Sequence, residues 1–239
     1  MDSMYRRYSG VVYLLIGVDT TNDGITDDYD RYVATGFMVA PDVMVTAAHN
    51  FVSDEDNEAI TSVRIFAGWH DEDIPTASSQ GYVYPQTWIM HSNFEDYYTN
   101  TDLYRSEYLN YDWCVVKLQN EIEGVYNFNC TYTYNIKTNT SVIASGYPLC
   151  ATLSCGNNDC SHNQGYLITS WGQIDIVNDL CFSLTNNLKD GHSGGPIYIS
   201  YYGYSNVCCG IISTGYDDYN VGTRIVEYVY NIIANYIEQ

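Results

Sequence analysis

The most specific pattern in the sequence is DGHSGGP, Asp190 to Pro196, in which one serine lies among three glycines. Glycine lacks a Cβ, so it lets the backbone turn sharply and approach a ligand closely. A plain tight turn would account for the glycines alone. A serine presented on such a turn is instead typical of a nucleophile, which needs a neighbouring base to take its proton. Ser193 is therefore the first candidate catalytic residue.

Two earlier segments offer partners for this serine. VMVTAAH, Val43 to His49, is an apolar strand that ends in a histidine, and DWCVVKL, Asp112 to Leu118, is an apolar strand preceded by an aspartate. Each segment alone is typical of ordinary structure, since aspartates before strands are usually turn residues. In the chain order His49, Asp112, Ser193, however, the three match a His–Asp–Ser catalytic triad.

This order differs from that of subtilisins and of α/β-hydrolases. The sequence resembles the chymotrypsin-like serine proteases, and within them the compact bacterial branch that includes the glutamyl endopeptidases. The resemblance spans about residues 10–239 and includes three further segments: TGFMVA (Thr35 to Ala40), SGYP (Ser145 to Pro148) and GTRI (Gly222 to Ile225).

The resemblance implies an all-β fold, a chymotrypsin-like double antiparallel β-barrel with a C-terminal α-helix. Within a single peptidase unit over 1–239, it implies an N-terminal barrel over 10–120, a connection over 121–141, a C-terminal barrel over 142–222 and the helix over 223–239.

The spacing of apolar residues is consistent with such a fold. Short apolar stretches separated by polar turns are typical of a barrel or sandwich, and they occur at 11–18, 32–40, 43–48, 62–68, 82–90, 113–118, 142–147, 165–169, 181–184, 196–201 and 207–213. From Ile225 onward the apolar residues follow helical spacing. The polar segments 95–111 and 119–141 predict a long surface loop and the crossing between the two halves.

The resemblance also implies roles for the site residues. Ser193 would be the nucleophile, His49 the general base and then acid, and Asp112 the group that orients the histidine. The backbone N–H groups of Gly191 and Ser193 would form the oxyanion hole. These roles predict a serine endopeptidase. A non-catalytic binding protein on the same fold is the alternative, although such proteins usually lack a triad residue.

The expected specificity pocket is lined by Asn187, Ile212, Ser213, Thr214 and Gly215. Trypsins carry an aspartate at the position of Asn187, which selects basic side chains, and glutamyl endopeptidases carry a histidine at that of Ile212. Glutamate specificity is therefore not supported, and a neutral or basic residue before the scissile bond is favoured. Two other departures from trypsins are Asn50 in place of a disulfide cysteine and His192 in place of the aspartate that captures a new N-terminus. We expect His192 to be structural.

The charge sets limits on partners. The 239 residues include nine Lys and Arg against 29 Asp and Glu, a net charge of −20. Nucleic acid and anionic membranes are excluded as partners, because both require basic residues. No apolar run approaches the roughly 20 residues of a membrane helix. We expect a secreted monomer that acts on proteins or peptides. The segment 11–18 after Arg6 and Arg7 imitates a short signal peptide but lacks a cleavage site.

No cofactor is required for this chemistry, but a calcium site is an open alternative. DTTNDGITDDYD, residues 19–30, has the spacing of a calcium-binding EF-hand loop, although its flanks predict strands rather than helices. A solvated acidic turn is the competing interpretation. The candidate ligands are Asp19, Thr21, Asp23, Ile25, Asp27 and Asp30.

The chain has eight cysteines, an even number compatible with disulfides and export. Cys155 and Cys160 bracket the short loop CGNNDC and are the first candidates for a bridge. A zinc site formed by Cys150, Cys155, Cys160 and His162 is an alternative, although its spacing is not a standard zinc pattern. Cys114 lies in an apolar strand, which predicts a buried free thiol.

Overall fold

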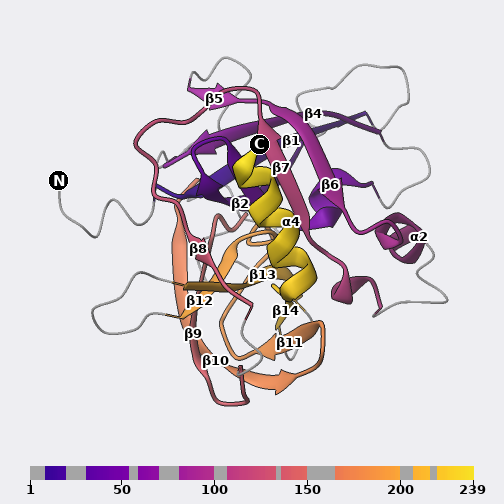
Figure 1. The fold of residues 1–239 in the computed structure, drawn as a ribbon, viewed down its shortest axis with the longest axis vertical. Coiled ribbons are helices and arrows are strands. Elements are labelled where there is room, and N and C mark those ends of the chain that lie inside the picture. The colour runs from indigo at the N-terminus through magenta and orange to yellow at the C-terminus, as the bar shows by residue number, and fades with distance from the viewer. Residues whose placement is uncertain are drawn as a thin grey trace.

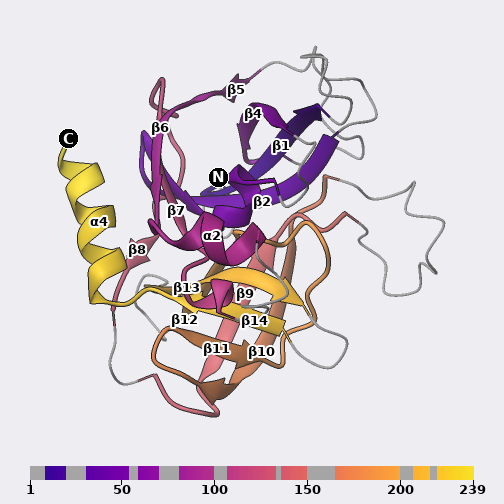
Figure 2. The ribbon, with the colours of Figure 1, turned by 90° about the vertical axis from the view of Figure 1, so that its right-hand side faces the viewer.

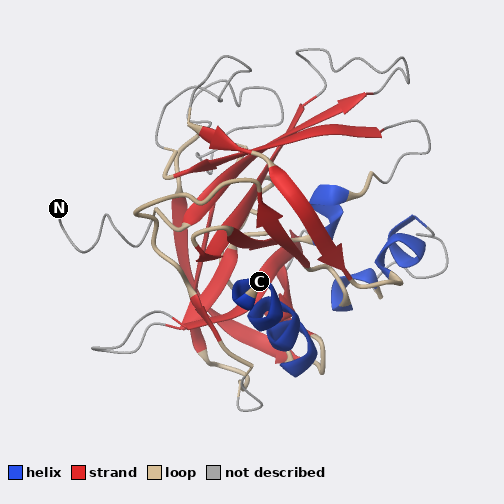
Figure 3. Cartoon of the chain, turned by 45° about the horizontal axis from the view of Figure 1, so that its top comes forward, coloured by secondary structure: helices blue, strands red, loops and turns tan. Residues whose placement is uncertain are grey.

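The structure is a computed structural model that describes residues 9–19, 31–53, 59–69, 81–99, 107–132, 136–149, 165–199, 207–215 and 220–239. Two mainly antiparallel sheets lie one above the other, the first indigo to magenta and the second mostly orange in Figure 1. Strands make up most of the described fold, and the helices are few and short (Figure 3).

The first sheet holds the N-terminal half of the chain in the order β5-β4-β1-β2-β3-β7-β6. Its strands are β1 (Val11–Asp19), β2 (Arg31–Ala40), β3 (Val43–Thr46), β4 (Ala59–Ala67), β5 (Tyr82–Val83), β6 (Pro85–Met90) and β7 (Cys114–Leu118). Because β5 and β6 are its two end strands, hydrogen bonds between the described strands do not close this sheet into a complete barrel.

The second sheet has the order β12-β9-β10-β11-β14-β13-β8, and β12 also pairs with β13, which closes six of its strands into a barrel. β8 joins β13 in parallel. Its strands are β8 (Asn129–Cys130), β9 (Ser141–Gly146), β10 (Ile168–Val177), β11 (Cys181–Leu184), β12 (Pro196–Ile199), β13 (Val207–Gly215) and β14 (Asn220–Arg224).

Strand β1 explains how the first sheet is anchored. All nine of its residues are buried, because successive side chains point to opposite faces and both faces are covered. Val11, Tyr13 and Leu15 join the core that lies between the sheets. Val12 and Leu14 join the interior of the first sheet. A strand buried on both faces is continuously apolar rather than alternating, as this stretch is in the sequence.

Helices lie outside the two sheets. α4 (Glu227–Glu238) follows the second sheet but returns to pack on β7, β2 and β3 of the first (Figure 2). It buries Val229 and Ile233, while Lys117 of β7 donates to the Tyr236 carbonyl at 3.5 Å and pairs with Asp42 at 2.8 Å. No helix in the described part of the chain has both the length and the apolar character needed to cross a membrane.

The predicted all-β architecture with a terminal helix is confirmed, with local differences. Two short helical elements overlap the segment 95–111, which was predicted to be a loop. They are α2 (Phe94–Thr99) and a 3₁₀ turn at Tyr108–Asn110. The crossing 119–141 contains β8. β10 continues eight residues beyond the predicted stretch 165–169, because the polar residues Gln173 and Asp175 interrupt the apolar pattern.

Tyr147 connects the two sheets. Its buried hydroxyl donates to the Trp69 carbonyl at 3.0 Å, and the Val11 carbonyl is a second acceptor at 3.4 Å. Its ring packs edge-on against Tyr13 of β1, with 5.3 Å between ring centroids. Burial raises the pKa of the Tyr147 hydroxyl far above its ordinary value, so it remains a donor at all working pH values.

We expect Tyr147→Phe to lower the free energy of unfolding by about 1–2 kcal/mol, because it removes the hydrogen bonds that the buried Tyr147 hydroxyl donates to the first sheet and its attached segments. Urea denaturation of the purified protein measures this change. Tyr228→Phe is the matched control, since Tyr228 is 57% exposed. Equal stability of the Tyr147 variant and the wild type would show that the hydroxyl does not tie the sheets together.

Candidate active site

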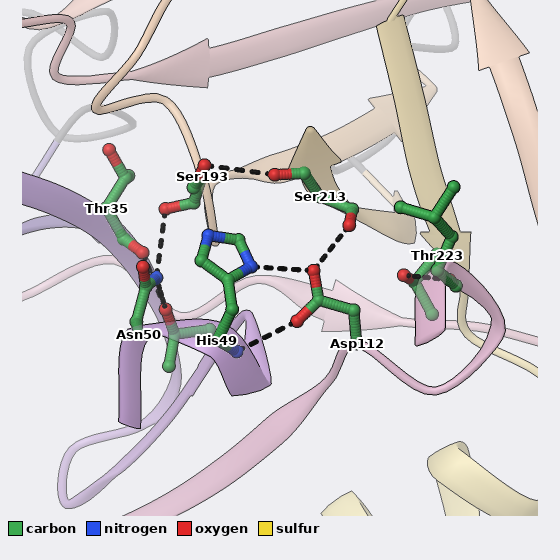
Figure 4. Close-up of polar contacts among 9 residues, drawn as sticks. Thr35, His49, Asn50, Asp112, Ser193, Ser213 and Thr223 are labelled. Atoms are coloured by element: carbon green, nitrogen blue, oxygen red, sulfur yellow. Dashed lines mark hydrogen bonds and ion pairs between the residues drawn. The ribbon is translucent and has the colours of Figure 1, made fainter. Parts of the chain in front are cut away.

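His49, Asp112 and Ser193 meet where the two sheets join (Figure 4). His49 lies in a 3₁₀ turn, Ala48–Phe51, directly after β3, and Asp112 lies two residues before β7. Since β3 and β7 are antiparallel neighbours, with Thr46 opposite Cys114, the end of one strand lies beside the start of the other. The first sheet therefore supplies the histidine and the aspartate. Ser193 comes from the turn between β11 and β12 of the second sheet.

The carboxylate of Asp112 holds His49 through two hydrogen bonds. Its Oδ2 accepts from Nδ1 of His49 at 2.8 Å, and its Oδ1 accepts from the His49 backbone N–H at 3.0 Å. Ser213 Oγ also donates to Oδ2. Because an ionised carboxylate only accepts, Nδ1 of a neutral His49 carries the proton and Nε2 keeps its lone pair.

Asp112 is completely buried, which by itself would raise the pKa of its carboxyl group. The charge of His49 and the hydrogen bonds from His49 and Ser213 act in the opposite direction and outweigh burial, so the pKa lies below its ordinary value. The aspartate therefore stays ionised in neutral and mildly acidic solution. A buried anion beside the imidazole stabilises its protonated form when it takes up a proton.

Ser193 is fixed mainly through its backbone. Its carbonyl accepts from the N–H of Thr35 at 2.9 Å and from Nδ2 of Asn50 at 3.2 Å, so two groups of the first sheet hold the turn in place. Its hydroxyl donates to the Ser213 carbonyl at 2.9 Å. The ring of His49 lies between Asp112 and Ser193 in Figure 4. Rotation about the Cα–Cβ bond of Ser193 is the step that would direct Oγ to Nε2.

The glycines around Ser193 are required by close contacts. Gly191 has a φ of +91°, and a Cβ there would lie 2.4 Å from the Tyr147 carbonyl oxygen. Gly194 has a φ of +88°, and its Cβ would lie 2.1 Å from the Thr35 carbonyl oxygen. Only glycine adopts such a conformation in so little space. Gly191 and Gly194 are therefore required by the tight packing of this turn on its neighbours.

Two backbone hydrogen bonds orient the peptide groups of the turn. Leu149 N–H donates to the Asp190 carbonyl at 2.7 Å, and Gly195 N–H donates to the His192 carbonyl at 2.9 Å. In a trans peptide the N–H points away from the carbonyl of the same unit. The N–H groups of Gly191 and Ser193 therefore point away from these two partners.

Thr35 is a site residue that sequence reasoning did not single out. Its Oγ1 donates to the Gly191 carbonyl at 2.7 Å and accepts from the Tyr147 N–H at 2.9 Å. Its own carbonyl accepts from Thr46 Oγ1 at 2.7 Å. A buried threonine on a strand carries no signal of this role, because its partners lie far away in the sequence. Asn50, expected only to mark a missing disulfide, is a second such residue.

The residues expected to form the specificity pocket lie in two places. Ile212, Ser213, Thr214 and Gly215 follow one another on β13. The backbone of Ile212 bonds to Gly194 and Gly195, which brings this strand to the serine turn. The Ile212 side chain is buried in the core of the second sheet. Asn187 is exposed after β11, and its N–H donates to Ser170 Oγ of β10 at 3.0 Å.

A cavity of about 220 Å³ lies beside the proposed reactive groups. It contains His49 and Ser193 in its wall, and its remaining lining comes from the first sheet and the segments attached to it: Ile16, Val18, Tyr32, Val33, Asn50, Val52, Ser53, Ile60 and Tyr98. A reacting group placed here has access to both side chains.

The predicted metal and disulfide sites fall mostly outside the described residues. Asp19 is the buried last residue of β1, but the other candidate calcium ligands, Thr21 to Asp30, are not described. The same holds for Cys150, Cys155, Cys160 and His162. The described cysteines are free, and Cys114 is buried as predicted: Cys114, Cys130, Cys181, Cys208 and Cys209. Within the described ranges, no three His, Cys, Asp or Glu residues group to hold a metal ion.

His192 is buried, with 1% of its surface exposed. Its Nδ1 lies 3.1 Å from the Lys189 backbone nitrogen and 3.0 Å from the Lys189 carbonyl oxygen. Its Nε2 has no hydrogen-bond partner among the described residues. Burial lowers its pKa to about 4, so His192 is neutral at pH 7. This environment fits the structural role expected for it.

His192 makes stability depend on pH. Because its pKa is about 4 when folded and about 6.5 when unfolded, the unfolded chain binds more protons between these values. Its contribution is complete above pH 6.5 and lost as the pH falls towards 4, up to about 3 kcal/mol in total. We expect His192→Gln to lose correspondingly less stability between pH 7 and 4 in urea denaturation. Parallel losses for the variant and the wild type would contradict this assignment.

The chain is similar to known bacterial proteases. Two curated relatives are each 24% identical to the chain: an extracellular metalloprotease of Bacillus subtilis, over 87% of this chain, and a glutamyl endopeptidase of Bacillus licheniformis, over 84%. The chain spans 59% and 58% of the lengths of these two proteins.

Solved structures share the fold. A Glu endopeptidase in complex with MPD aligns with a TM-score of 0.70 and 19% identity, covering 97% of this chain and 92% of that one. A thermostable serine protease, AL20, from an extremophilic microorganism aligns with a TM-score of 0.65 and 15% identity, covering 96% of each chain. The family model described as Trypsin matches residues 18–236. The chain therefore belongs to the trypsin family of serine peptidases.

Proposed function

We propose that this chain is a secreted serine endopeptidase that hydrolyses peptide bonds through an acyl-enzyme on Ser193. The observation that carries this proposal is the buried Asp112 carboxylate, which holds Nδ1 of His49 at 2.8 Å while the imidazole lies beside Ser193. Membership of the trypsin family supports a peptidase.

In the first half of the reaction, Ser193 Oγ attacks the carbonyl carbon of the scissile bond. Nε2 of His49 takes the hydroxyl proton, and Asp112 stabilises the resulting imidazolium. The carbonyl oxygen becomes an oxyanion, which the N–H groups of Gly191 and Ser193 stabilise. His49 then gives its proton to the leaving amine as the C–N bond breaks, which leaves the acyl group on Ser193.

In the second half, a water molecule replaces the leaving amine. His49 removes one proton from this water as its oxygen attacks the acyl carbon, and then returns a proton to Ser193 Oγ as the ester bond breaks. The carboxylic acid departs and the starting state is restored. No step requires a cofactor, although calcium binding by residues 19–30 remains a separate proposal.

For the residue before the scissile bond, we propose a neutral or basic side chain. Asn187 is neutral, and the Ile212 side chain is buried in the core, so neither supplies a positive group for a glutamate. The net charge of −20 also repels acidic substrates. The similarity to a glutamyl endopeptidase therefore supports peptide-bond hydrolysis, but it does not support a preference for glutamate before the scissile bond.

Secretion and a monomeric state belong to the same proposal. One relative is named as extracellular, and an acidic chain with eight cysteines is compatible with export. The partner is a protein or peptide substrate rather than nucleic acid or a membrane, as the charge argues.

The proposal is tested by mapping cleavage sites. A mixture of denatured proteins is digested with the wild type, Ser193→Ala and Asp112→Asn, and the new termini are identified by mass spectrometry. We expect Ser193→Ala to lower the rate by roughly 10⁶-fold and Asp112→Asn by roughly 10⁴-fold, because the first removes the nucleophile and the second stabilises the wrong histidine tautomer.

The matched controls are Ser141→Ala and Asp175→Asn, which change exposed residues of β9 and β10 and should leave the rate unchanged. Cleavage that persists in Ser193→Ala would refute the mechanism. Binding of peptides without cleavage by the folded wild type would favour the alternative, a binding protein on the peptidase fold.

The rate should also depend on pH through His49. Nε2 must be unprotonated to accept the serine proton, so kcat/KM should fall roughly below pH 7. Asp112 does not set this limit, because its pKa lies below the ordinary value. A pH series with one ester substrate measures the profile. A rate that stays constant down to pH 5 would exclude His49 as the base.

A further inference from the structure

A second and larger groove lies on the first sheet, away from the residues of the proposed reaction. It encloses about 600 Å³ and lies between β4 and β6, where hydrogen bonds do not close the sheet. Its lining combines apolar and aromatic side chains with polar ones such as Thr61 and Gln119, and the first group includes Phe51, Tyr84, Pro85, Trp88 and Met90. Tyr84 and Trp88 are 37% and 49% exposed, more than a structural core residue would be.

This groove adjoins the cavity that contains His49 and Ser193. Val52, Ser53 and Ile60 line both of them. The 3₁₀ turn Ala48–Phe51 also joins them directly, because it carries His49 towards the cavity and Phe51 towards the groove. Phe51 in turn contacts Trp88, with 5.3 Å between ring centroids. A polypeptide that leaves the cavity on this side would enter the groove.

The position of the groove indicates which part of a substrate would occupy it. The residue before the scissile bond is expected near β13 of the second sheet. The described residues that line the groove belong to the first sheet and its attached segments, and none of them lies on β13. It therefore suits residues that follow the scissile bond.

The lining also indicates a side-chain chemistry. Among the lining residues that the structure describes, Glu95 in the first turn of α2 is the one that carries a charge, and it is an acid. Trp88 presents a half-exposed indole in the same groove. Indole faces attract guanidinium and ammonium groups, and their hydrocarbon stems cover apolar surface. The net charge of −20 acts in the same direction.

We propose that this groove, centred on Trp88 and Glu95, is a distal subsite that binds an arginine or lysine of the substrate several residues after the scissile bond. The inference rests on the proposed peptidase function and adds a second determinant of specificity to it. The basic side chain lies over the indole of Trp88, and its charge is directed to the carboxylate of Glu95.

The test uses amidated peptides that share one cleavage site. A single arginine is moved through positions 2 to 8 after the scissile bond, and the other positions after the bond hold glycine, serine or alanine. We expect kcat/KM to rise roughly 5- to 20-fold when the arginine reaches one or two of these positions. The gain should weaken in high salt, because the ion pair is exposed.

Two variants locate the effect. Trp88→Ala should abolish the gain, and Glu95→Gln should reduce it roughly 2- to 5-fold. Hydrolysis of a p-nitrophenyl ester should remain unchanged in both, since this substrate has no residue after the scissile bond. The matched controls are Trp171→Ala and Asp175→Asn, because both residues are exposed on β10 of the second sheet.

Binding provides a readout that does not depend on chemistry. The same peptides, labelled with a fluorophore, are titrated against Ser193→Ala and followed by anisotropy. We expect arginine at the favoured position to lower Kd, and we expect this decrease to disappear when Trp88→Ala is added. A profile that does not depend on arginine position in both assays would overturn the subsite, as would a phenylalanine that gives an equal gain.

The outcomes separate the two proposals. Ester hydrolysis that survives in Ser193→Ala contradicts the peptidase mechanism. The anisotropy titration alone then tests whether the groove binds arginine. Ser193-dependent hydrolysis together with a flat arginine profile leaves the mechanism in place and refutes only the distal subsite.

Discussion

The proposed chemistry depends on one buried ionic contact, between the carboxylate of Asp112 and the imidazole of His49. A fully buried anion is costly unless its oxygens are hydrogen-bonded, and here both oxygens are occupied by His49 and Ser213. The contact forms because β3 and β7 are antiparallel neighbours whose adjoining ends carry the two side chains. The fold of the first sheet thus determines the tautomer of the histidine, and through it the lone pair that Ser193 needs.

The second requirement is that Ser193, which belongs to the other sheet, stays beside this pair. Thr35 and Asn50 of the first sheet hold its backbone carbonyl, and Thr35 also holds that of Gly191. The glycine turn packs so closely on these groups that a single Cβ at Gly194 would meet the Thr35 carbonyl oxygen. The contacts that assemble the site are therefore also contacts that hold the two sheets together. Substitutions at this junction should affect stability and activity together.

Much of this arrangement was predictable from local sequence. The short segments that carry His49, Asp112 and Ser193, the apolar stretch that became β1 and the helical spacing after Ile225 are each patterns of residues close together in the chain. The role of Thr35 was not predictable, because its partner Gly191 is 156 residues away. For similar reasons, patterning missed α2, which begins with a single buried aromatic residue, Phe94, and the far half of β10, whose outer face is exposed. Local pattern shows which side of a strand is buried, whereas hydrogen bonds between sheets arise only in the assembled fold.

In the proposed mechanism, this junction makes Ser193 a nucleophile among the many serines of the chain. The most direct measurement is the reaction of the folded protein with phenylmethylsulfonyl fluoride, followed by intact mass and peptide mapping. We expect one sulfonyl adduct, located on Ser193, that is absent from Ser193→Ala and forms much more slowly in Asp112→Asn. An unmodified protein, or adducts spread over several serines at rates independent of Asp112, would contradict it.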